Sequence, residues 1–499
     1  MRLSHPETRC ARHHPWIGAL TLLASLAGAA RPSAAGAEGE PSRYVVSWVR
    51  EDPPRLRVEA SLPIEGRELA MNTTRPGSIP DLDAGGWPAL VVDPSAVDEH
   101  GTALVLQSAG DGGWRLAQAH SGRIELRYEV DYAPFAALDW PAAREACWLE
   151  EGFFSVIGRS LFVTTPAQEA SSVVFELPAG WRAVTPWDEL PGAPQAFAVP
   201  ATPLLTENLL VFARSAPEVV SAGGLRVLVV STQAWGGARA EVRRVLEGAI
   251  PRLSEFMGSA DRGNYLVALL PQRETGGEAF RSSFTLTFAA APSRENSGVW
   301  GNTIAHEVFH MWNGWGLRGA DYASSQWFQE GFTEYAANVA LAAAGIVTQE
   351  AFLAKLAEHV RRSRELSTSL EATGGRKGPP LYSAGALVAF DWDVRIRHAT
   401  GGTKDLWNVL RALWERTGGG EWPYEWADIE AALAQTADLD WSSVHRDHVA
   451  GREPLPLVET FALAGIALRE RADGAPELAL DPSASEAARA LWRALISGN

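Results

Sequence analysis

Two histidines and a glutamate that could bind and use a metal ion stand in the stretch HEVFH, residues 306–310. Residues four apart lie on one face of an α-helix, so His306 and His310 can present ring nitrogens to one ion. Zinc lowers the pKa of a bound water to about 7, and Glu307 is then placed to take the water's proton during attack on a carbonyl. Two hydrogen-bonded histidines buried on an amphipathic helix would give the same pattern without a metal.

A catalytic zinc needs a third protein ligand, and the downstream stretch QWFQEGFTEY, residues 326–335, offers one. Glu330 lies in the first turn of the helix that this stretch predicts and is the best third ligand. Glu334 follows one turn later on the same face and is placed to orient a ligating histidine. The alternative is that both are solvated helix carboxylates, which their apolar neighbours argue against.

Three stretches together resemble one family of metallopeptidases. HEVFHMWN (306–313), WFQEGFTEY (327–335) and YSAGALVAF (382–390) are similar to the glycyl aminopeptidase family of gluzincins, distant relatives of aminopeptidase N and leukotriene A4 hydrolase. The resemblance extends over about residues 226–470 and is weaker before them, where FFSVIGRSLFVTTP (153–166) matches best. It implies one zinc ion, a thermolysin-like catalytic domain and a β domain in front of it.

The resemblance also implies two further site residues. Glu278, with Gly276 and Gly277 in the segment TGGEA, matches the strand-edge Glu that binds the free α-amine of the substrate. Tyr382 matches the tyrosine whose hydroxyl stabilises the tetrahedral oxyanion. Ala279 and Ala384 stand where the relatives usually carry a polar residue and a lysine, and these departures bear on exopeptidase specificity more than on zinc binding.

The rest of the chain predicts the elements that must position these residues. Between about residues 44 and 225, apolar and polar residues alternate between breaks rich in Pro and Gly, which indicates an antiparallel β-sandwich. After Ser231 we expect a helix over residues 238–253, an apolar strand over residues 265–270, a turn at Gly276–Gly277 and an alternating strand over residues 283–288. Helices are then predicted over residues 303–312, 326–344, 350–365, 383–400, 405–415 and 427–435.

These patterns predict an α+β multidomain protein. An N-terminal β domain is expected over residues 38–225, and a mainly helical, thermolysin-like peptidase domain over residues 226–452. A short C-terminal extension, Ala-rich and partly helical, is expected over residues 453–499. Too few residues follow Gly451 to form the PDZ domain with which members of the family commonly end, so we expect this chain to lack it.

The N-terminus is typical of a secretory signal peptide, which we expect over residues 1–37. Arg2, Arg9 and Arg12 precede an apolar run over residues 16–30, and Ala-x-Ala cleavage sites follow. The chain is therefore predicted to be exported to the periplasm or the extracellular space, with an uncleaved anchor as the alternative. No later segment is apolar enough to span a membrane. Cys147 would be the single remaining cysteine, a small buried hydrophobe without a disulfide partner.

Composition narrows the possible partners. The 499 residues carry a formal net charge of −16, and no dense cluster of Lys and Arg occurs, which argues against nucleic acid. The expected function is a zinc metallopeptidase, foremost an aminopeptidase that removes small N-terminal residues from peptides. Two alternatives stay open: a zinc endopeptidase, and a noncatalytic peptide-binding protein that keeps the peptidase fold.

Overall fold

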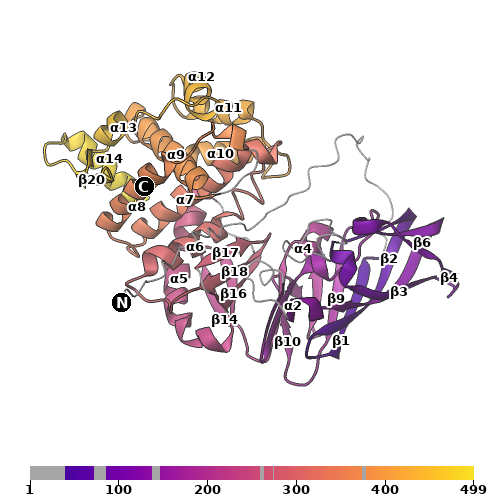
Figure 1. Cartoon of the computed structure of the whole chain (residues 1–499). Coiled ribbons are helices and arrows are strands. Elements are labelled where there is room, and N and C mark those ends of the chain that lie inside the picture. The colour runs from indigo at the N-terminus through magenta and orange to yellow at the C-terminus, as the bar shows by residue number, and fades with distance from the viewer. Residues whose placement is uncertain are drawn as a thin grey trace, which may run out of the picture.

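The computed structural model describes residues 40–71, 86–136, 147–258, 263–272, 275–373 and 378–498. The predicted signal peptide, residues 1–37, lies outside this range. Figure 1 shows the two regions that the sequence predicts, with the β-rich N-terminal half on one side and the helices on the other. The part of the chain that the structure describes contains no helix long and apolar enough to cross a bilayer.

The N-terminal region consists of two sheets that enclose one core. The larger sheet has the order β11-β12-β9-β1-β2-β6-β3-β4, with β5 paired to β6, and the smaller has the order β10-β13-β8-β7. Alternate residues such as Leu56, Val58 and Leu62 are fully buried, as the period-2 pattern predicts. Neighbouring strands are antiparallel except β1 and β9, which are parallel, so the sandwich is not purely antiparallel.

The strands of these two sheets have the following bounds. The larger sheet contains β1 (Ser42–Arg50), β2 (Arg55–Ala70), β3 (Val91–Asp98), β4 (Ala103–Leu104), β5 (Leu106–Ser108), β6 (Gly113–Asp131), β9 (Ser171–Glu176), β11 (Asp188–Glu189) and β12 (Ala196–Val199). The smaller sheet contains β7 (Cys147–Glu150), β8 (Phe153–Ile157), β10 (Arg182–Val184) and β13 (Leu209–Ala213). Two short helices, α2 (Ala133–Ala136) and α4 (Thr202–Thr206), lie between strands.

A third sheet of five strands joins the two regions. Its order is β14-β15-β16-β18-β17, with β15, β16 and β18 parallel and the two edge strands antiparallel. The strands are β14 (Glu218–Ala222), β15 (Leu225–Ser231), β16 (Gly263–Pro271), β17 (Gly276–Ala279) and β18 (Ser283–Phe288). One face packs on the helices through residues such as Val227, and the other packs on the β-sandwich core through residues such as Leu228.

This sheet changes two details of the sequence interpretation. The expected domain boundary at residue 225 falls inside the β14–β15 hairpin, so a division between β13 and β14 fits the sheet better. Gly276 and Gly277, which we expected in a turn, begin the edge strand β17 and pair with Thr287 and Leu286 of β18. Backbone pairing with β18 decides the conformation here, whereas a Gly-Gly pair by itself favours a turn.

Helices form most of the rest of the molecule, and the predicted ones begin and end within about four residues of their predicted bounds, except the one predicted over residues 303–312, which begins six residues earlier. They are α5 (Arg239–Met257), α6 (Ser297–Phe309), α7 (Tyr322–Ala343), α8 (Gln349–Ser363), α9 (Pro379–Ala399), α10 (Leu406–Arg416), α11 (Trp426–Thr436), α12 (Trp441–Val444), α13 (Leu457–Leu463) and α14 (Glu486–Ser497). The central helix is α7, in which residues 325–341 are all buried. Its neighbours include α5, α6 and α9.

Close contact between α7 and α9 depends on two glycines. A side-chain carbon on Gly331 would lie 2.3 Å from the backbone of Gly385, and one on Gly385 would lie 2.2 Å from the carbonyl oxygen of Trp327. Any larger residue at either position would force the two backbones apart. Because Gly331 follows Glu330 directly, this contact also fixes the depth at which Glu330 lies.

The last residues are part of the helical core. After α13, the hairpin of β19 (Ile466–Glu470) and β20 (Pro476–Leu480) leads into α14. Phe461 and Trp492 are buried in the same core as α6 and α7, and the indole N–H of Trp492 donates a hydrogen bond to Gln349 at 2.7 Å. The segment expected as an extension, residues 453–499, therefore packs as an integral layer of the helical region.

Candidate metal centre and active site

Helix α6 presents the three residues of the HEVFH stretch. His306, Glu307 and His310 are all buried, and the two imidazole rings are 4.7 Å apart between centroids. The helix ends at Phe309, three residues earlier than predicted, but His310 keeps helical backbone angles and its N–H bonds to the carbonyl of His306 at 3.2 Å. The i, i+4 relation that the sequence predicts is therefore kept.

Glu330 of α7 completes a group whose geometry fits a metal ion. Its Oε2 lies 3.4 Å from Nε2 of His306 and 3.5 Å from Nε2 of His310. A tetrahedral zinc with ligand distances of about 2.0–2.1 Å holds its ligand atoms about 3.4 Å apart. Within the described ranges this is the one group of His, Cys, Asp or Glu that could hold an ion. Two imidazoles and one carboxylate are a donor set typical of catalytic zinc.

A buried asparagine orients the second histidine. Nδ1 of His310 lies 2.9 Å from the backbone carbonyl oxygen of Asn313, so this nitrogen donates a hydrogen bond. Nε2 of His310 is then free to bind a metal ion together with His306 and Glu330, the three residues that we call the metal group. The side-chain amide of Asn313 donates to the carbonyl oxygens of Phe328 and Gln329. The turn after α6 is thereby fixed to α7 next to Glu330.

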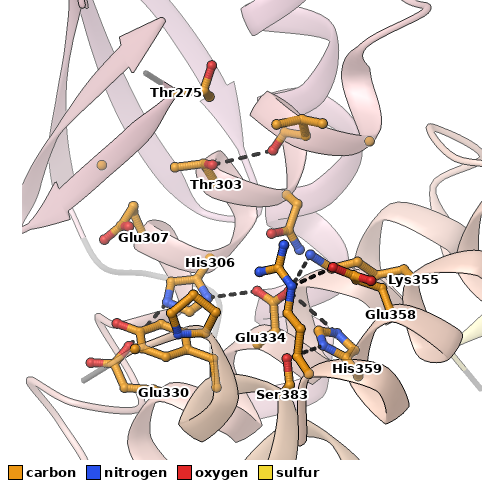
Figure 2. A pocket seen from close by; sticks show the side chains of 18 of the residues that line it. Thr275, Thr303, His306, Glu307, Glu330, Glu334, Lys355, Glu358, His359 and Ser383 are labelled. Carbon is orange, nitrogen blue, oxygen red and sulfur yellow. Dashed lines mark hydrogen bonds and ion pairs between the residues drawn. The ribbon is translucent and has the colours of Figure 1, made fainter. Parts of the chain in front are cut away.

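Glu334 contacts the first histidine. Its Oε2 lies 3.2 Å from Nδ1 of His306, and its Oε1 lies 2.8 Å from Nζ of Lys355 and 3.6 Å from Nε2 of His359 (Figure 2). Burial by itself would raise the pKa of Glu334, but Lys355 and the two histidines hold that pKa well below its usual value. The carboxylate is therefore ionised and available to accept the His306 proton.

Lys355 and His359 were missed at the sequence level. Both come from α8, where they are four residues apart and so share one helix face. His359 is buried, with Nδ1 3.1 Å from the Ser383 hydroxyl and Nε2 3.3 Å from the Asn338 amide. Burial lowers the pKa of His359 to about 4, so the ring is neutral at pH 7. The sequence feature that could have identified His359 is its place among the apolar positions of an amphipathic helix.

The edge strand β17 approaches Glu307 closely. A side-chain carbon on Gly277 would lie 2.7 Å from Cγ of Glu307 and 3.0 Å from its Oε1. Only glycine lets the strand come this near to the carboxylate. Glu278, the next residue, lines the same cavity as Glu307. Gly277 and Glu278 therefore line the cavity that holds His306, His310 and Glu330, whereas Gly276 is not among the residues that line it.

Tyr382 of α9 lies over the first histidine. Its ring is stacked on that of His306, with centroids 5.7 Å apart and planes 16° apart. Burial, followed by the charges of Glu330 and Glu307, raises the pKa of Tyr382 well above its usual value. The phenol is therefore protonated at neutral pH and can act as a hydrogen-bond donor.

All of these groups line one cavity of about 370 Å³. Glu278, Glu307 and the His306–His310–Glu330 group share it with Tyr382 and with residues of α8. The cavity thus combines a metal-binding group, a carboxylate beside it, a phenol donor and a second carboxylate on an edge strand. These are groups that metal-assisted hydrolysis of an amide bond can use.

Comparison with known proteins agrees with this chemistry. Residues 300–373, which include HEVFH and Glu330, match the sequence model of the M61 glycyl aminopeptidase family. No curated protein has a significant match to the sequence.

Solved structures share the fold over most of the chain. An aminopeptidase N family protein from Idiomarina loihiensis is 18% identical, with a TM-score of 0.71 over 86% of this chain and 79% of that chain. An M1 zinc metallopeptidase from Deinococcus radiodurans is 18% identical, with a TM-score of 0.53 over 83% and 94%. A mutant of the latter bound to the substrate Tyr-Ser-Ala is 16% identical, with a TM-score of 0.55 over 83% and 94%.

Motif, ligand geometry and fold thus agree. The chain shares the fold of M1 zinc metallopeptidases, and its residues 300–373 match the M61 glycyl aminopeptidase model; with a His-His-Glu group that can bind one ion, it is a zinc metallopeptidase.

Proposed function

We propose that the protein is an aminopeptidase that hydrolyses the first peptide bond of peptides with a free N-terminus. The observation that carries the proposal is the position of Glu278, a carboxylate that lines the metal cavity from an edge strand whose preceding residue, Gly277, lies against Glu307. A carboxylate there pairs with a substrate ammonium and limits the substrate to one residue before the cleaved bond. Preference for small first residues is supported by the match to glycyl aminopeptidases.

His306, His310 and Glu330 would hold the zinc ion. When bound, zinc supplies a Lewis acid that polarises the scissile carbonyl and lowers the pKa of a water molecule. Glu307 accepts the proton of the attacking water and passes it to the leaving amine. The protonated hydroxyl of Tyr382 donates a hydrogen bond to the oxyanion as it forms, and Glu278 holds the substrate's N-terminus.

We further propose that the protein works after export, in the periplasm or outside the cell. The basic residues, apolar run and Ala-x-Ala sites within residues 1–37 support this. Expression of the full chain followed by N-terminal sequencing of the protein recovered outside the cytoplasm would test it, and a full-length, cytoplasmic product would contradict it.

The enzymatic proposal is tested with a peptide pool of which half is N-acetylated. Purified protein with measured zinc content should trim only the free N-termini, and mass spectrometry should show Gly and Ala released first. Glu307→Gln should lower kcat by about a thousandfold without loss of zinc. Glu278→Gln should lower kcat/KM for free peptides by about a hundredfold.

The matched control is Glu295→Gln, because Glu295 is an exposed carboxylate and should leave the rates unchanged. Cleavage of acetylated peptides at internal bonds would identify an endopeptidase instead. Intact peptides despite one zinc per chain would favour a noncatalytic peptide-binding protein.

A further inference from the structure

Two cations line the cavity on the α8 side. Lys355 and Arg362 are the only Lys and Arg on its wall among the residues that the structure describes. They are seven residues apart on α8 and therefore share one helix face. Figure 2 shows Lys355 and Glu307 on opposite sides of His306. The cavity thus has Glu278 and Glu307 on the β17 side, and both cations on the α8 side together with their partners Glu334 and Glu358.

Both cations keep hydrogen-bonding capacity for a ligand. Lys355 has three N–H donors, and its ion pair with Oε1 of Glu334 at 2.8 Å uses one of them. The described ion pair of Arg362 uses Nε, which lies 2.5 Å from Glu358, so the terminal nitrogens of the guanidinium remain to bind a carboxylate in fork geometry. Their side chains are 35% and 40% exposed, respectively, so a ligand can reach them.

The carboxylate that pairs with Arg362 also pairs with a second cation. Arg361 donates to both carboxylate oxygens of Glu358 at 2.7 Å and to Glu365 at 2.9 Å, and Arg361 does not line the cavity. The charge of Glu358 is therefore shared by two guanidinium groups, of which only Arg362 faces the cavity.

Two carboxylates also line the wall around the cations, and each is already paired. Glu334 pairs with Lys355, and Glu358 pairs with Arg362. His359 lies one turn after Lys355 and one turn before Arg362, and its ring is neutral at pH 7. Both cations and both carboxylates act on this imidazole through their charge, so the four charged groups surround the same part of the wall. Ser383, whose hydroxyl contacts His359, also lines the cavity and is uncharged.

We propose that Lys355 and Arg362 form a subsite for a carboxylate on the residue that follows the cleaved bond. This inference rests on the proposed function, because Glu278 holds the N-terminus on one side of the metal group and the chain must continue toward α8 on the other. The carboxylate comes either from an acidic side chain at the second position or from the free C-terminus of a dipeptide. The enzyme should therefore select peptides by charge at the second position as well as by the size of the first residue.

Two pairs of peptides separate these sources. Gly-Glu-Phe-amide and Gly-Gln-Phe-amide differ only in the second side chain, and we expect kcat/KM to be about tenfold higher for the acidic peptide. Gly-Phe and Gly-Phe-amide differ only at the C-terminus, and the free dipeptide should be preferred if the α-carboxylate is the ligand. A preference in either pair supports the subsite and identifies its source.

Arg362→Met and Arg361→Met are matched variants, because both remove a partner of Glu358 but only Arg362 lines the cavity. Arg362→Met should reduce the Glu/Gln ratio to about twofold, Arg362→Lys should give an intermediate ratio, and Arg361→Met should keep the full ratio. Circular dichroism confirms that each variant is folded. Lys355→Met is less informative, because Lys355 also contacts Glu334.

Binding to the Glu307→Gln protein gives a readout that does not need turnover. Calorimetry should show a lower Kd for the Glu peptide than for the Gln peptide, and this difference should disappear in the Glu307→Gln, Arg362→Met double variant. If no peptide is cleaved, the proposed function fails while the Kd ratio still decides the subsite. Equal kcat/KM and equal Kd in both peptide pairs, or equal loss of preference in the Arg361 and Arg362 variants, would overturn the subsite.

Discussion

Glu334 connects the first zinc ligand to α8 through one carboxylate. One oxygen accepts from Nδ1 of His306, and the other pairs with Lys355. Glu334→Gln removes the negative charge that fixes the His306 tautomer, so we expect zinc affinity to fall by about 10- to 100-fold. Competition with a chromophoric chelator measures this Kd. Excess zinc should restore much of the activity, because the ligands themselves are intact.

Glu358→Gln is the control for this prediction, since Glu358 lies in the same cavity and contacts Arg361 and Arg362. Its loss should leave the zinc Kd within about twofold of the wild-type value. If the two variants weakened zinc binding equally, the effect would come from the total charge of the cavity and the orienting role of Glu334 would be wrong.

His359 should make the metal-stripped protein sensitive to acid. Its pKa is about 4 in the folded chain, against about 6.5 for an unperturbed histidine, so between these values the unfolded chain binds more protons. Stability therefore rises with pH across this window, is complete above about pH 6.5, and is lost as the pH falls toward 4. Between pH 6.5 and 5 this residue should lower the free energy of unfolding by about 1.5 kcal/mol.

The substitution His359→Gln isolates this effect, because glutamine does not titrate and can still bond to Ser383 and Asn338. Urea unfolding at pH 5 and 6.5, with chelator present, should show a smaller change in the variant. Limiting the range to pH 5 and above avoids the titration of Glu334, whose pKa lies well below 4.5. The same pH slope in both proteins would show that His359 is not neutral in the folded chain.

At the scale of elements, the α7–α9 contact is the most demanding feature of the site. Gly331→Ala would place a carbon 2.3 Å from the backbone of Gly385, and we expect it to lower the free energy of unfolding by about 3 kcal/mol. Zinc affinity should fall as well, because Glu330 is its neighbour. Chemical denaturation and metal titration measure the two effects.

Gly301→Ala is the matched control within a buried helix. Its added carbon would meet Val245 at 3.5 Å, an ordinary contact distance, and alanine is the better helix former by about 1 kcal/mol. This variant should be as stable as the wild type or more so. An equal loss of stability in both variants would mean that the contact of α7 with α9 is not specially close.

Much of the order of helices and strands could be predicted, because the hydrophobic periodicity of each element lies within its own segment of the sequence. The helix predicted over residues 326–344 is α7 (Tyr322–Ala343), and the strand predicted over residues 283–288 is β18. The two histidine ligands could be predicted because i, i+4 spacing is a property of one helix. β17 could not, since its strand conformation comes from pairing with β18. The contact of Lys355 and His359 with Glu334 depends on how α8 packs beside α7, which no single segment encodes.

At the scale of the whole molecule, the five-stranded sheet belongs to two cores. Its residues Leu228, Val230, Leu266 and Leu270 are buried against the β-sandwich, whereas Val227, Val229 and Leu269 face the helices. The apolar strand predicted at residues 265–270 reflects this double burial, since a strand covered on both faces needs no polar alternation. The sequence alone could not show which element covers the second face.

A chain that begins at Glu218 would leave that second face exposed. We expect such a truncated protein to aggregate, because an uncovered apolar sheet face is an association surface, while a chain that begins at residue 38 should be soluble and unfold in one cooperative transition. Size-exclusion chromatography and calorimetry compare the two proteins. A monomeric truncated protein that binds zinc with native affinity would show that the helical region folds independently.

The location of the metal ligands has a consequence for how the enzyme responds to heat. His306, His310 and Glu330 lie on α6 and α7, the helices at the centre of the larger core, so their arrangement is lost when that core unfolds. An ion that binds only the folded chain adds about 1.4 kcal/mol of stability for each tenfold rise in its free concentration above Kd. The melting temperature therefore rises with the free zinc concentration. In a zinc-poor medium the enzyme becomes easier to unfold as well as inactive.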